Sequence, residues 1–345
     1  MAAFLARRLL LAAAVLLVVS YGTFVVFATK FTTQCPSALT PTNVAAPPLA
    51  GSVHDASILY WDWLKRVPSG GSFETVCGIE GSFFLSFWPS VGHTAVLLGL
   101  AMTFVVVFSL LLGTIGATRS GSAVDVVLRA FSYATWAVPA FVLAVVLQNV
   151  LEWAKSHHGF TTFAVSGWPG SCEVTPFSTL FGQQTCPHLG TGTPYALAVL
   201  QSTFVPALAL SLSFIGLHSR YLRSALLVSL AAPYTTTAYA KGLSERRVVL
   251  RHALRNSLAT FTSALLLDMG AIFGAAMVVD WVFGLGGLGT LFLTLVHGIG
   301  AGDGPRYLDA YSIENVVTLT AIFVLTMSIL AEVAVRWLDP RARVA

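Results

Sequence analysis

The sequence predicts an all-α integral membrane protein with six transmembrane helices and two external loops. Of its 345 residues, 56% are hydrophobic and only 10% are charged, whereas a soluble domain is about 25% charged. The mean hydropathy is +0.78, and the apolar residues fall in runs of about the 20 residues that a spanning helix needs. The net charge of +4 does not indicate nucleic-acid binding, because in a membrane protein the placement of Lys and Arg matters more than their sum.

The first apolar run, Leu9–Thr29, follows two arginines and is longer than the roughly 7–15 apolar residues at the core of a secretory signal peptide. We therefore interpret it as a retained span whose N-terminus is cytoplasmic. Pro139 is expected to kink the third span, which neighbouring helices can tolerate. An even number of spans returns the C-terminus to the cytoplasm. The other five expected spans are Thr94–Ala117, Phe131–Leu151, Tyr195–His218, Leu258–Asp280 and Tyr311–Val335.

Polar segments separate these spans within what we expect to be a single membrane domain, residues 1–345. Residues 30–90 form external loop 1, which prolines interrupt and acidic residues keep in water. Inside it, Ile58–Val67 has its aromatic residues at helical spacing and predicts a short helix. Residues 153–194 form external loop 2, and residues 219–257 form a cytoplasmic loop.

The distribution of cations supports this topology. The expected topology puts 14 of the 19 Lys and Arg residues in the cytoplasm, in agreement with the positive-inside rule. The tryptophans agree, because Trp88, Trp153 and Trp281 fall at outer span ends and Trp337 at an inner one. The external cations are Lys30, Lys65, Arg66, Lys155 and Arg306.

All four cysteines fall in the two external loops: Cys35 and Cys77 in the first, Cys172 and Cys186 in the second. Thiols on an oxidising face favour disulfides, and pairing within each loop is the simplest of the three possible connectivities. A metal site is the alternative, although no Cys-x-x-Cys spacing supports it. The histidines that suggest it are His157, His158 and His188.

One polar stretch, Pro233–Leu258, interrupts the apolar second half of the chain. Pro233 suits the first position of a helix, and Gly242 can supply the left-handed turn that ends one, so a two-turn helix fits between them. Ser244 can then cap a second helix. At a spacing of four, arginines share one face of this second helix and leucines another, as in a helix at the boundary between apolar and wet surroundings. These residues are Arg247, Arg251 and Arg255, and Leu250, Leu254 and Leu258.

The run Thr237-Ala238-x-Ala240-Lys241-Gly242-Leu243-Ser244-Glu245-Arg246-Arg247, followed by His252–Asn256, resembles the cytoplasmic signature loop of ABC-importer permeases of the oligopeptide/dipeptide/nickel type. Tyr239 and Thr260 depart from the family pattern, which usually has a basic residue and a proline there. A basic loop that merely binds anionic lipid headgroups is the alternative. The resemblance implies that the short helix docks in a groove of a separate ATPase subunit, through Tyr234, Thr237, Ala238, Ala240, Lys241, Gly242, Glu245 and Arg246.

Two further segments carry the same resemblance. Arg119–Ser122 with Asp125, and then Val138–Phe141, are similar to the family's link and third span. Asp280–Gly289 is similar to the segment after its fifth span. This last segment also matches G-x-G-x-x-G literally, but it follows a membrane helix and not a strand, and no Gly-Lys-Ser/Thr phosphate loop occurs in the chain. We therefore expect no cofactor in this chain, with ATP and Mg bound by partner subunits.

The resemblance implies a type I ABC-importer permease in a bacterial inner membrane, a translocation subunit without catalytic activity. Its expected partners are a second permease subunit, two cytoplasmic ATPase subunits, an external substrate-binding protein and the lipid bilayer. Peptides are the expected solute, with nickel, haem or sugar as alternatives. A passive channel is a further hypothesis, and it would need no ATPase.

Asp268 is the one acid in the middle of an expected span, and intramembrane acids usually face the bundle interior or a water-filled cavity. Together with Asp280 it is a candidate for the translocation path, although a protonated or paired structural aspartate is the favoured interpretation. Gly270 and Gly274 form a small-x-x-x-small face suited to close helix contact. Gly300–Asp303 also resembles the motif of intramembrane aspartyl proteases, which would pair Asp303 with Asp268 as acid and base.

Overall fold

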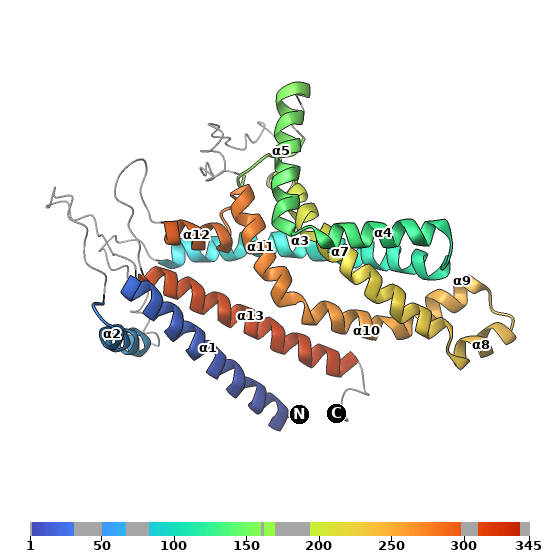
Figure 1. Ribbon diagram of the computed structural model, residues 1–345, viewed down its shortest axis with the longest axis horizontal. Coiled ribbons are helices and arrows are strands. Elements are labelled where there is room, and N and C mark those ends of the chain that lie inside the picture. Colours follow the sequence, from blue (N-terminus) through green and yellow to red (C-terminus); the bar gives the residue numbers. More distant parts are fainter. Residues whose placement is uncertain are drawn as a thin grey trace. The chain divides into compact units, whose positions relative to one another are not determined.

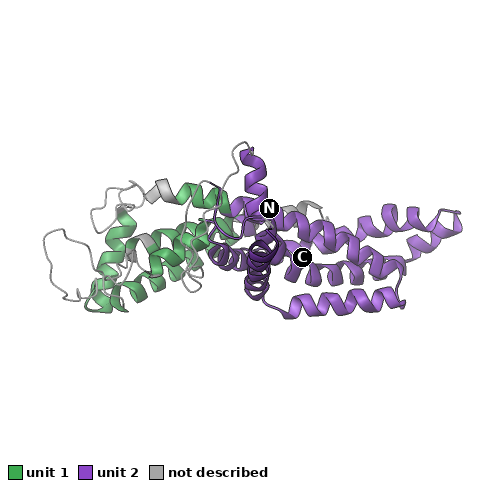
Figure 2. Ribbon diagram, turned by 90° about the horizontal axis from the view of Figure 1, so that it is seen from above, with its two compact units in different colours: residues 1–93, 286–326 green, residues 94–285, 327–345 purple. Residues whose placement is uncertain are grey.

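A computed structural model describes residues 2–30, 50–66, 83–159, 162–169, 194–297 and 310–338 as helices joined by short turns. None of these residues forms a strand, so the all-α prediction is confirmed for them. The chain divides into two compact units, coloured separately in Figure 2. Unit 1 comprises residues 1–93 and 286–326, and unit 2 comprises residues 94–285 and 327–345.

Unit 1 is built from α1 (Ala2–Lys30), α2 (Val53–Arg66), α12 (Leu288–His297), the beginning of α3 (Phe83–Thr118) and most of α13 (Ala310–Leu338). The short helix expected in external loop 1 is confirmed as α2, which begins five residues before the predicted start at Ile58. Ser52 prepares that start, since its hydroxyl accepts a hydrogen bond from the Asp55 amide at 3.2 Å.

The inner face of α2 is aromatic and buried. Tyr60 and Trp63 are each 2% exposed and pack with Phe24 and Ala28 of α1. The rings of Tyr60 and Trp63 are stacked at 5.7 Å, and Tyr311 of α13 meets Phe24 edge-on at 5.5 Å. Burial of large rings dominates the packing energy of such contacts, so α2 is held to α1 and α13 by its aromatic residues.

A buried polar network lies inside this aromatic cluster. The Ser20 hydroxyl donates to Glu314 Oε1 at 2.5 Å and lies 3.0 Å from the Tyr60 hydroxyl. Thr318 also donates to Glu314 Oε1, at 2.7 Å. Trp63 Nε1 donates to Asn315 Oδ1 at 3.0 Å. Three helices that are far apart in the sequence are therefore joined by specific hydrogen bonds as well as by apolar contact.

Unit 2 is organised around α7 (Tyr195–Leu230), against which α4 (Ala123–Ala137), α5 (Ala140–His158), α10 (Leu254–Leu267) and α11 (Met269–Phe283) all pack. Small residues permit the close approach. A Cβ on Gly216 would overlap the Ser132 carbonyl and the Thr135 hydroxyl of α4, and one on Gly113 of α3 would come within 2.9 Å of Leu222 Cδ2. Figure 1 shows α7 running alongside α4 and α10.

The third expected span is two helices and not one kinked helix, so that prediction is wrong. α4 ends at Ala137, α5 begins at Ala140, and their axes differ by 96°. Val138 and Pro139 between them are extended, with ψ of 122° and 141°. Proline disfavours a helical conformation in the residue before it and cannot donate its own backbone hydrogen bond, which explains why the chain turns here.

The fifth expected span is also interrupted, at Asp268, which joins α10 to α11. Its φ of −85° and ψ of −1° lie in the bridge region, and the helices on either side of it are bent by 50°. Hydrogen bonding nevertheless continues through the break: the Asp268 amide donates to the Ala264 carbonyl at 3.1 Å, and the Ile272 amide donates to the Asp268 carbonyl at 2.9 Å.

The described residues contain three helices long and apolar enough to cross a membrane alone, over residues 6–30, 87–118 and 195–230. The number rises to five if each bent pair is one span. The apolar part of α13, Ile313–Ile329, is shorter than these. The chain is therefore multi-pass, and the exact number of six spans stays a prediction.

Candidate functional site

The helix α8 (Pro233–Ala240) projects from one end of unit 2, beyond the ends of α4, α7 and α10 (Figure 1). It begins where predicted. Ala232 is extended and Pro233 occupies the first turn, where its missing N–H costs nothing. The Thr235 hydroxyl donates to the Ala232 and Leu230 carbonyls, at 2.5 and 2.9 Å, and so fastens α8 to the end of α7.

The end of α8 is the predicted glycine turn. Gly242 has a φ of +76°, which side chains with a Cβ rarely adopt. Its amide donates to the Tyr239 carbonyl at 2.9 Å, and the Leu243 amide donates to the Ala238 carbonyl at 3.4 Å. These bonds satisfy carbonyls that the helix would otherwise leave open. A Cβ on Gly242 would meet nothing within 4 Å, so a substitution there acts through backbone strain alone.

The two faces of α8 differ sharply in exposure. Thr235 and Ala238 are buried against the chain itself. Ala238 is only 6% exposed, and its place in the docking set stays a prediction. The other seven predicted docking residues are exposed: Tyr234, Thr237, Ala240, Lys241, Gly242, Glu245 and Arg246.

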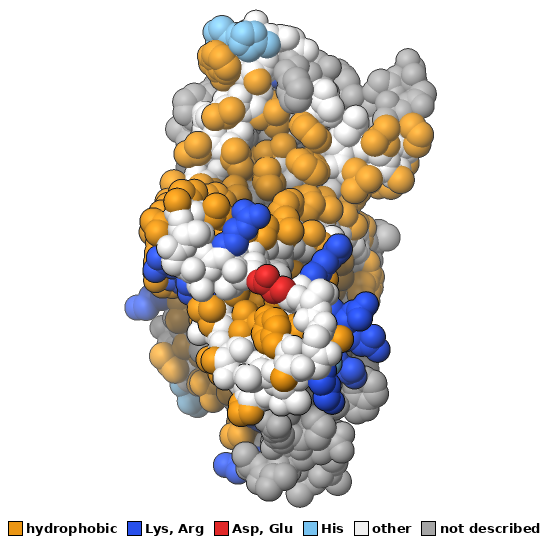
Figure 3. Space-filling model, turned by 90° about the vertical axis from the view of Figure 1, so that its right-hand side faces the viewer, with side chains coloured by type: hydrophobic (Ala, Val, Ile, Leu, Met, Phe, Trp, Pro, Cys, Tyr) orange, Lys and Arg blue, Asp and Glu red, His pale blue; other side chains and the backbone are white. Residues whose placement is uncertain are grey.

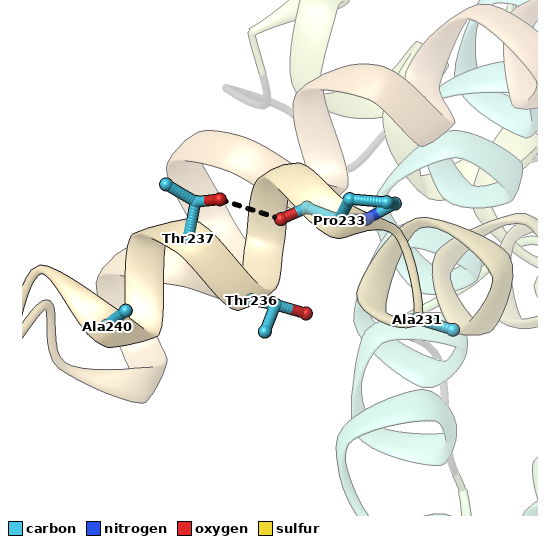
Figure 4. Close-up of a pocket in the computed structure, with 5 residues that line it drawn as sticks. All are labelled: Ala231, Pro233, Thr236, Thr237 and Ala240. Carbon is cyan, nitrogen blue, oxygen red and sulfur yellow. Dashed lines mark hydrogen bonds between the residues drawn. The ribbon is translucent and has the colours of Figure 1, made fainter.

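A concavity of about 510 Å³ runs along one side of α8, lined by Ala231, Pro233, Thr236, Thr237 and Ala240 (Figure 4). Its walls are methyl groups, the proline ring and two hydroxyls. The Thr237 hydroxyl donates to the Pro233 carbonyl at 3.0 Å, as the dashed line shows. Because the Thr237 hydroxyl donates its proton within α8, Thr237 presents its methyl group outward. The surface therefore suits an apolar partner surface with few groups that need hydrogen bonds.

The second predicted helix begins at Ser244, which is extended and precedes α9 (Glu245–Arg247). A π-helix, Val248–Ala253, separates α9 from α10. Contact with the rest of unit 2 is made by Val249, Ala253 and Ser257, whereas Leu250 and Leu258 of the predicted leucine face are 48% and 36% exposed. The arginine face of Arg247, Arg251 and Arg255 is exposed as expected.

Three polar residues join α10 to α7 and α8, and sequence reasoning did not identify two of them. Ser257 of α10 donates to the Ser229 hydroxyl of α7 at 2.9 Å. Asn256 donates to Ser229 Oγ at 3.4 Å and to the Tyr234 hydroxyl at 3.2 Å. The family resemblance included Asn256, but no local signal distinguished Ser229 or Ser257 from other serines in membrane helices.

Basic side chains gather at this end of unit 2, as Figure 3 shows. Among the exposed residues of the Lys241–Arg255 segment, five are cationic and only Glu245 is acidic. A partner that docks on α8 therefore meets a positive surface and gains if it is acidic. The five cations are Lys241, Arg246, Arg247, Arg251 and Arg255.

Asp268 has a partner on α7. His218 is fully buried, and its Nδ1 lies 2.9 Å from the Phe214 carbonyl, which can only accept, so Nδ1 carries a proton. Its other nitrogen, Nε2, lies 3.4 Å from Asp268 Oδ2, whose side chain is 29% exposed. Nε2 forms no hydrogen bond at this distance, and the contact is an ion pair only with a doubly protonated His218, so the interpretation of Asp268 as a protonated or paired structural aspartate stays a prediction.

The other path candidate, Asp280, is 1% exposed on α11 and so does not face an open surface of this chain. The small-residue face on α11 is open: a Cβ on Gly270 or Gly274 would meet nothing within 4 Å. No group of three or more potential metal ligands occurs among the residues searched, which are the described ones. Cys35, Cys77, Cys172, Cys186, His188 and Asp303 lie outside the described residues.

Comparisons with known proteins give a consistent result. The family described as "Binding-protein-dependent transport system inner membrane component" matches residues 106–344, more than half of the chain. A putative peptide permease of Brucella suis is 26% identical over 298 residues, which cover 83% of this chain and 80% of that protein. The oligopeptide transport system permease protein OppB of Mycobacterium tuberculosis is 27% identical over 362 residues and covers 100% of both chains.

Among solved structures, the inward-facing MetNI methionine ABC transporter has a chain that superposes with a TM-score of 0.51. The match covers 74% of the present chain and 97% of that chain, at 15% sequence identity. Similarity at this level of identity concerns the fold alone.

Proposed function

The chain belongs to the family of binding-protein-dependent transport system inner membrane components, and on that premise we propose that it is a peptide-translocating permease subunit whose helix α8 docks on a partner ATPase. The observation that carries the proposal is the form of α8. It is a preorganised two-turn helix with an exposed outer face, fastened at its base to both α7 and α10.

This arrangement suits the transmission of motion. ATP and Mg are bound by the ATPase partners, and ATP binding draws those partners together. α7 directly precedes α8 in the chain, and α9 and α10 follow it. A displacement of α8 therefore moves both α7 and α10. The break at Asp268 then allows α10 to tilt relative to α11, which opens the path to the other side in an alternating-access cycle. The subunit transmits work and performs no bond chemistry.

Peptide is the solute that the relatives favour. The Brucella and Mycobacterium proteins carry peptide and oligopeptide transport in their names, and the di/tripeptide permease protein DppB of Pseudomonas aeruginosa is 26% identical over 291 residues. Nickel, haem and sugar remain the alternatives. The ligand of the cognate external binding protein, identified by mass spectrometry after native purification, distinguishes among them.

The finer features of the proposal concern assembly and topology. The complex contains a second permease subunit, two ATPase subunits and one external binding protein. Six spans place both termini of this chain in the cytoplasm of a bacterial inner membrane, in agreement with its cation distribution. The disulfides Cys35–Cys77 and Cys172–Cys186 close the external loops. Peptide mapping without reduction tests them, and four free thiols would refute them.

Asp268 is the proposed contact for a peptide's amino group, and the partial exposure of its side chain at the break between α10 and α11 supports this role. Asp268→Asn keeps the side-chain volume and removes the charge. If the aspartate lines the path, the variant changes the uptake of cationic relative to anionic tripeptides. Wild-type uptake of both would assign Asp268 to its contact with His218 alone.

The central test compares two matched threonines. Thr237 on α8 and Thr118 at the end of α3 are both exposed, and each donates its hydroxyl to the carbonyl four residues earlier, at 3.0 and 2.9 Å. Thr237→Trp fills the concavity beside α8 and is expected to reduce co-purification of the ATPase and the uptake of labelled trialanine in proteoliposomes. Thr118→Trp adds the same side chain at a residue that does not line the concavity and is expected to leave both at wild-type levels.

The same experiment separates the rival functions. Wild-type co-purification and uptake in the Thr237→Trp variant would contradict docking through α8 and favour the lipid-binding interpretation of the basic loop. Trialanine flux without any ATPase partner would favour a passive channel. Cleavage of a membrane-embedded peptide by the purified chain, abolished by Asp268→Asn, would revive the aspartyl protease hypothesis.

A further inference from the structure

An ion pair with a buried aspartate and an arginine that is 23% exposed joins α4 to α7 at the same end of unit 2 that carries α8. Asp125 stands in the first turn of α4, and its side chain is 1% exposed. Arg223 of α7 approaches it in a fork, with Nε donating to Oδ1 at 2.7 Å and Nη2 donating to Oδ2 at 2.8 Å. Two parallel charge-assisted bonds fix orientation as well as distance.

The surrounding backbone is shaped to admit this pair. Gly121, with a φ of +79°, donates its amide to Asp125 Oδ2 at 3.1 Å. On α3, a Cβ added to Gly116 would come within 3.3 Å of Arg223 Cδ and 3.6 Å of Asp125 Oδ1. Three segments therefore meet at the pair: the end of α3, the turn before α4, and α7. Arg129 also approaches Asp125, but at 3.6 Å and from a side chain that is 46% exposed.

Packing of α4 on α7 does not depend on this pair. Gly216 already brings the two helices together, and the Ser132 and Ser219 hydroxyls lie 3.0 Å apart. Removing the Asp125 carboxylate from water is costly, and this cost offsets much of what its attraction to Arg223 contributes to stability. The ion pair is thus better explained by the register that it imposes than by the stability that it adds.

The position of the pair suggests why register matters. Arg223 precedes the first residue of α8, Pro233, by ten residues, about 15 Å at the rise of an α-helix. Between them, Ala117 of α3, Leu226 of α7 and Ala253 of the π-helix form a fully packed cluster. The ion pair and this cluster form two successive layers behind α8, and both include α3 and α7.

We propose that Asp125 and Arg223 are positioning residues that make α3, α4 and α7 move as one body when a partner displaces α8. This inference rests on the proposed coupling role of α8 and extends it to residues that contact neither the ATPase nor the solute. Without the pair, α7 can rotate or slide against α4, and displacement of α8 is absorbed at that contact before it reaches the rest of the bundle.

The test uses the complete importer in proteoliposomes and measures trialanine molecules imported per ATP hydrolysed. The decisive variant is the double substitution Asp125→Asn with Arg223→Met, which removes both charges, keeps an acceptor for the Gly121 amide and retains most of the Arg223 stem. We expect a fall of about fivefold or more in this ratio, the lower end of typical coupling effects, with normal ATPase co-purification and thermal stability. The matched control, Arg129→Met, removes the more distant arginine and is expected to keep the wild-type ratio.

A charge exchange, Asp125→Arg with Arg223→Asp, sharpens the result, because restoration of the ratio above that of either single variant identifies the ion pair itself as the cause. A wild-type ratio in the neutral double variant would overturn the proposal, as would an equal loss in Arg129→Met. Failure of the proposed function is recognised separately: in that case Thr237→Trp leaves ATPase association and uptake unchanged, whatever the Asp125 and Arg223 variants do.

Discussion

The α2 region of unit 1 and the α8 region of unit 2 are both short helices attached to long ones, yet their polar and apolar groups are used in opposite ways. α2 turns Tyr60 and Trp63 inward, where they are 2% exposed and hydrogen-bonded to other helices. α8 buries only Thr235 and Ala238 and turns both of its tyrosines outward, each more than 40% exposed.

The difference shows that a short helix can contribute either to folding or to association with a partner. The contacts of α2 are completed within the chain, so substitutions on its inner face should cost folding free energy. None of the described residues of unit 2 gives the outer face of α8 a comparable cover. Substitutions there should therefore cost association with a partner and leave folding almost unchanged. Stability and ATPase association, measured on the same variants, therefore separate the two regions.

The largest stability effect is expected from Trp63→Ala. It removes a fully packed ring and the hydrogen bond to Asn315, and buried Trp→Ala substitutions cost about 3–5 kcal/mol. Thermal unfolding of the detergent-solubilised chain measures the loss. Trp63→Phe is the control, because it keeps most of the ring and loses only the hydrogen bond, worth about 1 kcal/mol. Equal effects of the two variants would contradict the packing role.

A smaller effect is expected from Ala238→Trp. Ala238 is 6% exposed and faces the chain, so a large side chain must displace its neighbours, and overpacking costs about 1–3 kcal/mol. Reduced thermal stability should accompany any loss of ATPase association. Thr237→Trp, one residue earlier on the exposed face, should lose association at unchanged stability. If Ala238→Trp also keeps its stability, the inward orientation of Ala238 is wrong.

The contrast between the two regions also explains what the sequence could and could not predict. The α8 hairpin was predictable because its signals are local: Pro233 fixes its own backbone angle, and Gly242 permits a positive φ. The orientation of α8 was not, because an eight-residue helix of sequence PYTTTAYA has no apolar stripe to indicate its inner face.

The polar contacts inside both units could not be predicted from the sequence, for a different reason. Ser20 and Glu314 are separated by 294 residues, and Asp125 and Arg223 by 98. Nothing local marks either pair, since the partner of a buried polar group is set by tertiary packing. The sharp turn at Pro139 was underestimated because a proline between apolar runs is compatible with a kink or with a complete break.

Gly242→Val tests the turn after α8, with an expected strain of about 1–2 kcal/mol from the left-handed backbone. Because a Cβ there meets no neighbour within 4 Å, the strain is expected to redirect the chain between α8 and α9 more than to unfold it. ATPase co-purification should fall while membrane abundance stays near normal. Gly92→Val, at an equally open glycine with negative φ, controls for added bulk. Equal losses in both variants would contradict a specific role for the turn at Gly242.

The smallest effect is expected from Asn256→Ala, and it tests whether α8 is held by α10 or only by α7. The substitution removes the bonds to Tyr234 and Ser229, at 3.2 and 3.4 Å, while Ser257 keeps its own bond to Ser229. Hydrogen bonds between membrane helices average about 0.6 kcal/mol, so the melting temperature should hardly change. The rate of amide hydrogen exchange in α8 should rise nonetheless, because its Tyr234 side loses an anchor. Tyr234→Phe removes the same contact from the other partner and should raise exchange equally. If neither variant changes exchange in α8, the helix is held by Thr235 and the end of α7 alone, and α10 receives the motion of α8 only through the chain that connects them.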